Sequence, residues 1–226
     1  MIQYELLNNT LDIFPIFWKN KNHNICFLPM WDNGNWITEL SSKEIINQEL
    51  FNQKILNYAH EHNADLVLSG FLENREHMFR TLGCEQMVEQ WRFYHLGLDV
   101  SAPVWTQLFA PLDGEVVISM EEEWYGNYGW VLVLKHELNG ELLYSLYGHQ
   151  NIETLPEVWT FVKAWDKISE LWDYSWNGGY FHHLHLQLLT EQGFNEWFVS
   201  KWYTTAESLA TIENYVPNPN FIFRFS

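Results

Sequence analysis

The sequence predicts a mainly β fold with a smaller helical part, so an α+β protein overall. Two observations carry this prediction. In the second half of the chain, short runs of alternating or β-branched residues are separated by Gly or Asn-Gly, as strands joined by hairpin turns would be. Apolar residues at helical spacing occur near residues 45–60 and again at the start of the tail.

The first third of the chain mixes both kinds of pattern. Residues 27–31 predict a strand that enters a tight turn at 32–34, where Asp-Asn-Gly tolerates the positive φ of such turns. Ser41 resembles a helix N-cap, and helical spacing continues from there to about His62. Residues 71–90 read as a second helix-like or mixed segment.

The strands of the β part are expected at 114–120, 130–135, 141–147 and 180–188. The tail should begin as a helix over 191–202 and end extended after Pro217. We therefore expect an N-terminal mixed α/β extension over 1–91, a β domain over 92–190, and a C-terminal helical tail over 191–226 that packs on it.

Composition and charge exclude several classes of protein. With 47% hydrophobic and 17% aromatic residues, the chain is neither disordered nor of low complexity. A net charge of −17 argues against nucleic acid and anionic membranes as partners. The N-terminus lacks a signal-peptide pattern and no apolar stretch reaches transmembrane length, so we expect a cytoplasmic location. Cys26 and Cys84 can form at most one bridge, and two free thiols are the favoured interpretation.

The histidines suggest a metal site. His95 and Asp99 lie four residues apart beside a glycine, and His183 and His185 share one face of an expected strand while His182 points the other way. Imidazole and carboxylate ligands without thiolate suit Zn²⁺, and three such ligands leave a position for water, as in catalytic sites. A set of histidines that bind no metal is the alternative that spacing alone leaves open.

The order of short motifs resembles the lysostaphin/LytM-type zinc metallopeptidases. Five segments occur in the family's order and at its usual spacing, and together they span roughly residues 92–190. They are Tyr94–Val100, Ala110–Val116, Gly126–Gly129, Leu146–His149 and Asn177–Leu186. The resemblance implies that residues 92–190 fold as a compact antiparallel lysostaphin-like sheet with zinc on one face.

The resemblance also implies a role for each matching residue. His95, Asp99 and His185 would be the zinc ligands, and His149 and His183 would be the catalytic pair beside them. A nearby imidazole can accept the proton of a zinc-activated water, and another can hydrogen-bond the developing oxyanion. The sequence leaves open which of the two histidines is the base.

The chain departs from the family pattern in its turns. Tryptophan stands where the family commonly has glycine at Trp105, Trp130, Trp165 and Trp172, and His182 replaces a usual proline. Tryptophan supplies positive φ only at a steric cost, so either these turns are built differently or the match is loose there. We expect at least two of these rings to lie at surface turns, packed on neighbouring loops.

The resulting functional hypothesis is a zinc metalloendopeptidase that hydrolyses a peptide bond, with peptidoglycan-type cross-bridges as the family's usual substrate. The alternative is a catalytically latent zinc-binding module for a ligand or a protein. A cluster of aromatic residues near the motifs (Trp124, Tyr125, Tyr128, Tyr174, Trp176 and Tyr180) is either a substrate groove or packing that shields hairpin edges, and packing is the favoured interpretation.

Overall fold

An eight-stranded sheet runs through the computed structural model, which describes residues 16–17, 24–30, 35–122, 129–172 and 181–221. The strand order is β1-β2-β4-β11-β8-β7-β6-β9, and the pair at the β1 edge is parallel while the other neighbouring pairs are antiparallel. The strands of this sheet are β1 (Ile25–Phe27), β2 (Leu66–Ser69), β4 (Leu98–Ser101), β6 (Gly114–Glu122), β7 (Gly129–Leu138), β8 (Glu141–Gly148), β9 (Phe161–Val162) and β11 (His183–Thr190). The mainly β prediction is confirmed.

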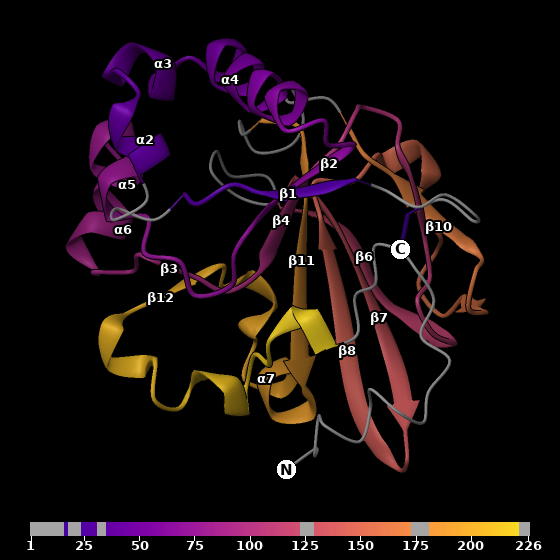
Figure 1. Ribbon diagram of the computed structural model, residues 1–226. Coiled ribbons are helices and arrows are strands. Elements are labelled where there is room, and N and C mark those ends of the chain that lie inside the picture. The colour runs from indigo at the N-terminus through magenta and orange to yellow at the C-terminus, as the bar shows by residue number, and fades with distance from the viewer. Residues whose placement is uncertain (1–15, 18–23, 31–34, 123–128, 173–180, 222–226) are drawn as a thin grey trace.

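Shorter elements cover the two faces of the sheet. Two small ladders pair β5 (Gln107–Phe109) with β10 (Lys167–Glu170), and β3 (Tyr94–His95) with β12 (Tyr203–Thr204). The N-terminal helices and the C-terminal segment lie on one side of the sheet, and β10 lies on the other (Figure 1). The helices are α2 (Asn35–Glu39), α3 (Ser42–Ile46), α4 (Gln48–Glu61), α5 (Glu76–Leu82), α6 (Glu85–Glu89) and α7 (Glu191–Asn195).

The helical stretch predicted from Ser41 to His62 is present as two helices. Ser41 forms a capping box with Glu44, whose carboxylate accepts a hydrogen bond from the Ser41 backbone N–H at 2.8 Å. The extended backbone of Asn47 ends α3, and its side-chain oxygen caps α4 through the Leu50 N–H at 3.0 Å. The spacing of apolar residues does not reveal this break, because both helices bury apolar residues in the same hydrophobic cluster, Ile45 from α3 and Phe51 and Ile55 from α4.

The tail differs from its prediction. Helix α7 stops at Asn195, because Trp197 adopts a left-handed conformation with φ 59° that an α-helix cannot continue. Residues 198–200 form a short 3₁₀ turn instead. A further 3₁₀ turn covers Pro219–Phe221, and residues 222–226 of the end that was expected to be extended lie outside the described residues.

Alternation along β11 divides its side chains between two environments. Leu184, Leu186 and Leu188 enter the main hydrophobic core with side chains from β4, β7 and β8. His183 and His185 project to the opposite face, where they line a small cavity together with Met78 of α5 and with Trp202 and Tyr203 of the C-terminal segment. Burial of the leucine face therefore fixes which way the histidines point.

Two of the four unusual tryptophans lie in turns. Trp105 and Trp165 have φ values of 68° and 74°, so these turns keep the left-handed backbone expected of glycine. Trp105 is 55% exposed and packs edge-on against Trp172, with ring centroids 5.2 Å apart, while Trp165 is half-buried. The prediction of surface turns is confirmed for these two residues. Trp130 and Trp172 are half-buried as well.

Three remaining expectations are settled or set aside. Cys26 and Cys84 are both free thiols. No helix among the described residues is both long and apolar enough to span a bilayer. The predicted turn at 32–34 and the aromatic cluster at 124–128 and 174–180 lie outside the described residues.

Candidate metal centre

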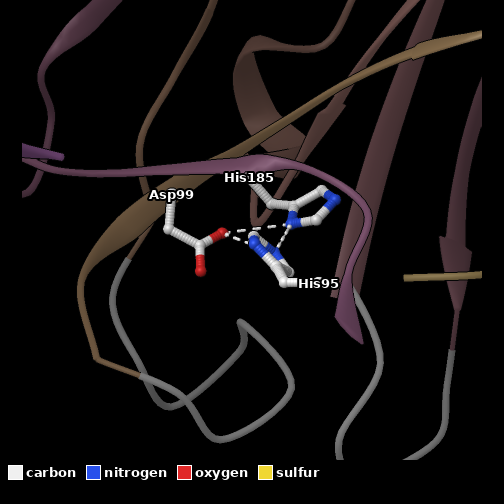
Figure 2. Close-up of side chains that lie close together, drawn as sticks. All are labelled: His95, Asp99 and His185. Carbon is white, nitrogen blue, oxygen red and sulfur yellow. Dashed lines mark hydrogen bonds and ion pairs between the residues drawn. The ribbon is translucent and has the colours of Figure 1, made fainter. Parts of the chain in front are cut away.

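The fold brings His95, Asp99 and His185 together from three strands. Asp99 on β4 pairs directly with His185 on β11 in the ladder, and His95 at the end of β3 turns toward both (Figure 2). Gly97 makes the approach possible: a Cβ there would lie 2.5 Å from His185 Cε1. The glycine between His95 and Asp99 is therefore needed for close packing.

The three side chains present donor atoms at the spacing of a small metal site. His95 Nε2 and His185 Nδ1 are 3.0 Å apart, and Asp99 Oδ1 lies 3.1 Å from His185 Nδ1 and 3.3 Å from His95 Nε2. Four ligands at about 2.0 Å around tetrahedral zinc are about 3.3 Å from one another. The observed separations are close to that value.

Hydrogen bonds behind the cluster assign the protons of both imidazoles. His95 Nδ1 faces the Gly70 carbonyl at 3.2 Å, so this nitrogen carries the proton and Nε2 presents a lone pair. His185 Nε2 faces Gln187 Oε1 at 3.2 Å. The Gln187 amide nitrogen donates to the carbonyls of Phe198 and Lys201, which fixes Oε1 as an acceptor and leaves His185 Nδ1 unprotonated.

Three electron pairs therefore converge with no proton assigned between them. Burial lowers the pKa of His95 to about 3. Burial alone would raise the pKa of Asp99, but the facing His95 and Arg75 outweigh it and hold this pKa well below its usual value. Neutral imidazoles and an ionised carboxylate are the protonation states that a metal ion requires, so the residues fit a divalent cation.

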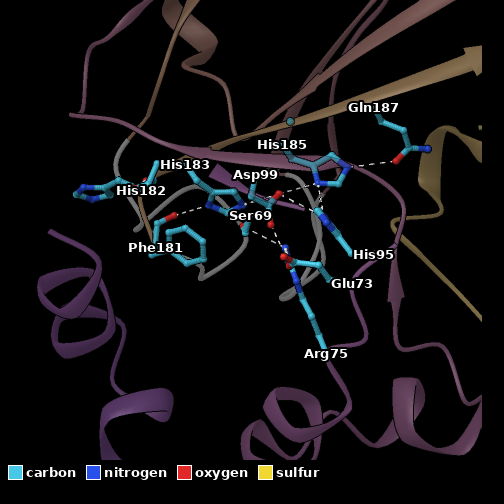
Figure 3. Close-up of polar contacts among 12 residues, drawn as sticks. Ser69, Glu73, Arg75, His95, Asp99, Phe181, His182, His183, His185 and Gln187 are labelled. Atoms are coloured by element: carbon cyan, nitrogen blue, oxygen red, sulfur yellow. Dashed lines mark hydrogen bonds and ion pairs between the residues drawn. The ribbon is translucent and has the colours of Figure 1, made fainter. Parts of the chain in front are cut away.

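His183 and His149 lie next to this cluster. His183 Nδ1 donates to the carbonyl of Phe181 at 2.7 Å. Nε2 is therefore the unprotonated nitrogen of this ring, and it lies 3.6 Å from Asp99 Oδ1. The His149 ring packs against that of His183 with centroids 4.3 Å apart. His182 points away from the cluster, as strand alternation predicted (Figure 3).

Both chain extensions enclose the site. His95, Asp99, His149, His183 and His185 are each at most 4% exposed. The cavity beside them measures about 20 Å³, room for about one water molecule. Its walls include Arg75 and Met78 from the N-terminal part and Trp202 and Tyr203 from the tail.

Sequence reasoning missed the residues that orient the cluster. Arg75 donates to Asp99 Oδ2 at 2.6 Å, although it lies 24 residues away and outside the motifs. Gln187 carried a usable signal, because it continues the alternation of His183 and His185 on the same strand face. Tyr203, whose hydroxyl accepts a hydrogen bond from Arg75 at 3.0 Å, left no pattern in the sequence.

The buried cluster of two imidazoles and one carboxylate, with two more histidines beside it, is a candidate metal centre. Residues 93–195 match the model of Peptidase family M23. This part of the chain is therefore similar to that peptidase family.

Solved structures with similarity to this chain include peptidases. The catalytic domain of the antimicrobial peptidase lysostaphin from Staphylococcus simulans is 23% identical, with a TM-score of 0.37 over 43% of this chain and 68% of that domain. A lysostaphin solution structure is 25% identical (TM-score 0.36, 44% of this chain, 38% of that one). A zinc-containing peptidase from Vibrio cholerae is 23% identical (TM-score 0.34, 43% and 28%).

This chain thus spans less than two fifths of the Vibrio peptidase and of the lysostaphin solution structure. No curated protein matched the chain.

Proposed function

We propose that the chain is a zinc-dependent peptidase that hydrolyses an amide bond in a peptide, with peptidoglycan-type cross-bridges as the substrate class. The observation that carries the proposal is the convergence of three lone pairs from His95, Asp99 and His185, 3.0–3.3 Å apart and without a proton between them. A divalent cation would satisfy all three donor atoms at once, and bound Zn²⁺ would acidify water and polarise the scissile carbonyl.

His183 is the proposed general base. Its Nδ1 donates to the Phe181 carbonyl, so Nε2 is the unprotonated nitrogen and lies on the side of Asp99. A proton taken up at Nε2 would lie near the Asp99 carboxylate, which stabilises the imidazolium. His149, in ring contact with His183, would then donate a hydrogen bond to the oxygen that gains charge in the transition state.

Metal content and cleavage, measured together, test these assignments. Purified wild-type chain should contain one zinc per molecule, and His95→Ala should lose it. His149→Ala and His183→Ala should keep zinc and lose on the order of 10²–10⁴-fold in the rate of cleaving glycine-containing bridge peptides. Equal zinc in wild type and His95→Ala would refute the ligand assignment, and loss of zinc from His183→Ala would make that residue a ligand.

One observation favours a latent zinc-binding module as the second candidate. The five central residues are almost fully buried, and the cavity beside them measures about 20 Å³. A zinc-loaded chain that cleaves none of the bridge peptides, even at high enzyme concentration, would support latency. Cleavage that depends on His183 would exclude it.

A further inference from the structure

The segment that follows β2 is built into the candidate metal centre. Ser69 at the end of β2 pairs with Asp99 in the ladder. Beyond it, the Leu72 N–H donates to the His95 carbonyl at 2.7 Å, and the His95 N–H donates to the Glu73 carbonyl at 3.0 Å. Residues 69–75 therefore run alongside His95 and carry the side chain of Arg75 to the far side of Asp99 (Figure 3).

Hydrogen bonds from both terminal nitrogens of the guanidinium, Nη1 and Nη2, fix the position of Arg75. Nη1 donates to Asp99 Oδ2 at 2.6 Å and to the Tyr203 hydroxyl at 3.0 Å. Nη2 donates to Ser69 Oγ at 3.2 Å and to Glu73 Oε2 at 3.3 Å. Arg75 is only 2% exposed. A planar guanidinium with this many partners has one orientation, so its contact with Asp99 is set by the fold.

The two oxygens of Asp99 consequently face different partners. Oδ1 faces His95, His183 and His185, whereas Oδ2 is occupied by Arg75. A carboxylate can bind a metal through one oxygen or through both. We propose that Arg75 is a positioning residue that restricts Asp99 to a single metal-facing oxygen and so keeps the coordination number low. This inference rests on the proposed function.

The consequence concerns the open position of the site. A second oxygen from Asp99 would occupy the place that three-ligand catalytic sites leave for water. Arg75 thus makes the N-terminal part of the chain a functional component of a centre whose ligands all lie in the β part. Tyr203 extends the same support to the tail.

Cobalt substitution tests this role without relying on activity. The Co²⁺ visible spectrum should be strong, as for four-coordinate sites, in wild type and in Arg80→Met, a matched variant of an exposed arginine paired with Glu76. It should weaken markedly in Arg75→Met as Asp99 becomes bidentate. The double variant Glu73→Gln, Arg75→Met also removes the charge of Glu73, the other carboxylate that Arg75 pairs with. No unpaired buried Glu73 charge is then left to destabilise the fold. An unchanged spectrum in folded Arg75 variants would overturn the proposal.

X-ray absorption of the zinc-loaded wild type gives a second readout that needs no variant. A first shell of four donors supports the restricted carboxylate, and five donors with a bidentate Asp99 would overturn it. A wild-type chain that binds neither metal would instead refute the proposed function itself, so the two failures are distinguishable.

A separate observation concerns tryptophans in left-handed backbone. Among the described residues, nine other than glycine have positive φ, and five of these are tryptophan. They are Trp91 (54°), Trp105 (68°), Trp159 (72°), Trp165 (74°) and Trp197 (59°). Asparagine tolerates this conformation through its short polar side chain, but a bulky ring does not, and glycine adopts it freely.

Packing accounts for these rings only in part, through the contacts of Trp105 with Trp172 and of Trp91 with Phe93. Four of the five are 53–72% exposed, and Trp165 is half-buried. The backbone, in contrast, is fully used: the N–H groups of Trp105, Trp159 and Trp165 donate to Leu171, Val116 and Ala110 at 2.8–3.0 Å. Each turn therefore depends on the left-handed backbone, which is the requirement that glycine meets.

We infer that these five positions are glycine in the protein as its own cell makes it. A single codon connects the two residues, because UGA is translated as tryptophan in some genetic codes and as glycine in others. Such reassignment would also explain why two of the four departures from the family's glycines, at Trp105 and Trp165, coincide with left-handed turns. The inference is independent of the metal centre.

The coding DNA and the native protein decide the matter. We expect UGA at all five codons, and peptide masses with glycine at these positions in protein isolated from its own cells. UGG codons, or peptides that contain tryptophan, would overturn the inference.

Recombinant chains test the physical argument directly. Replacing the five tryptophans by glycine should raise the melting temperature. Trp36→Gly should lower it, because Trp36 lies in α2 and its ring packs on Phe51 and Tyr58 of α4. A five-glycine chain that melts below the chain with tryptophan would contradict the reasoning.

Discussion

Gly97→Ala should damage the metal centre more than the fold. The added Cβ would lie 2.5 Å from His185 Cε1, 2.6 Å from Nε2 and 2.7 Å from the Leu186 carbonyl oxygen, whereas ordinary contacts begin near 3.4 Å. The His185 ring would have to move by almost an ångström. The Leu186 carbonyl cannot make room, because Leu186 pairs with Leu98 in the ladder between β11 and β4.

The expected size of the effect follows from these contacts. Overpacking of this kind costs about 1–3 kcal/mol of folding stability. Displacement of the ring also breaks the hydrogen bond from His185 Nε2 to Gln187. Loss of one such supporting contact lowers metal affinity by about 10–100-fold, and a ligand moved off its donor position should lose at least that much.

Competition with a chromophoric chelator measures the zinc affinity, and thermal melting measures stability. Gly140→Ala is the matched control: Gly140 has φ 82° with no atom within 4 Å of an added Cβ, so alanine should cost about 1–2 kcal/mol and leave zinc affinity unchanged. Wild-type zinc affinity in folded Gly97→Ala would refute the reasoning.

Three further changes should have separable outcomes. Burial lowers the pKa of His136 to about 4, so the unfolded chain takes up the proton before the folded chain does as the pH falls below about 6.5. Between neutral pH and pH 5, the free energy of unfolding of wild type should therefore fall by about 2 kcal/mol more than that of His136→Gln. Denaturant titrations in which both proteins lose the same free energy of unfolding would contradict this. Gln187→Leu should weaken zinc binding by about 10–100-fold, because His185 loses its acceptor; unaltered binding in the chelator assay would exclude that role. Gly193→Ala should destabilise the chain by about 1–3 kcal/mol, since its Cβ would overlap the Tyr215 carbonyl, and a melting temperature at or above that of wild type would argue otherwise.

One of the strands that carry the metal cluster, β11, was predictable from the sequence. Alternation along 183–188 follows from the pleat of a strand, and it correctly placed His183 and His185 on one face and His182 on the other. The spacing of His95 and Asp99 likewise indicated both residues as candidate metal ligands. Such features depend on residues a few positions apart, so local geometry is sufficient to derive them.

The supporting contacts were decided only by the tertiary structure. Arg75 reaches Asp99 across 24 residues and Tyr203 across 128, and no local period relates these positions. The proton positions on His95 and His185 depend on the Gly70 carbonyl and on an amide oriented by the tail. Burial decides the charge states as well, because desolvation depends on every segment packed around a group. The sequence alone therefore determined which residues can form the centre, and packing of distant segments determined how they are held.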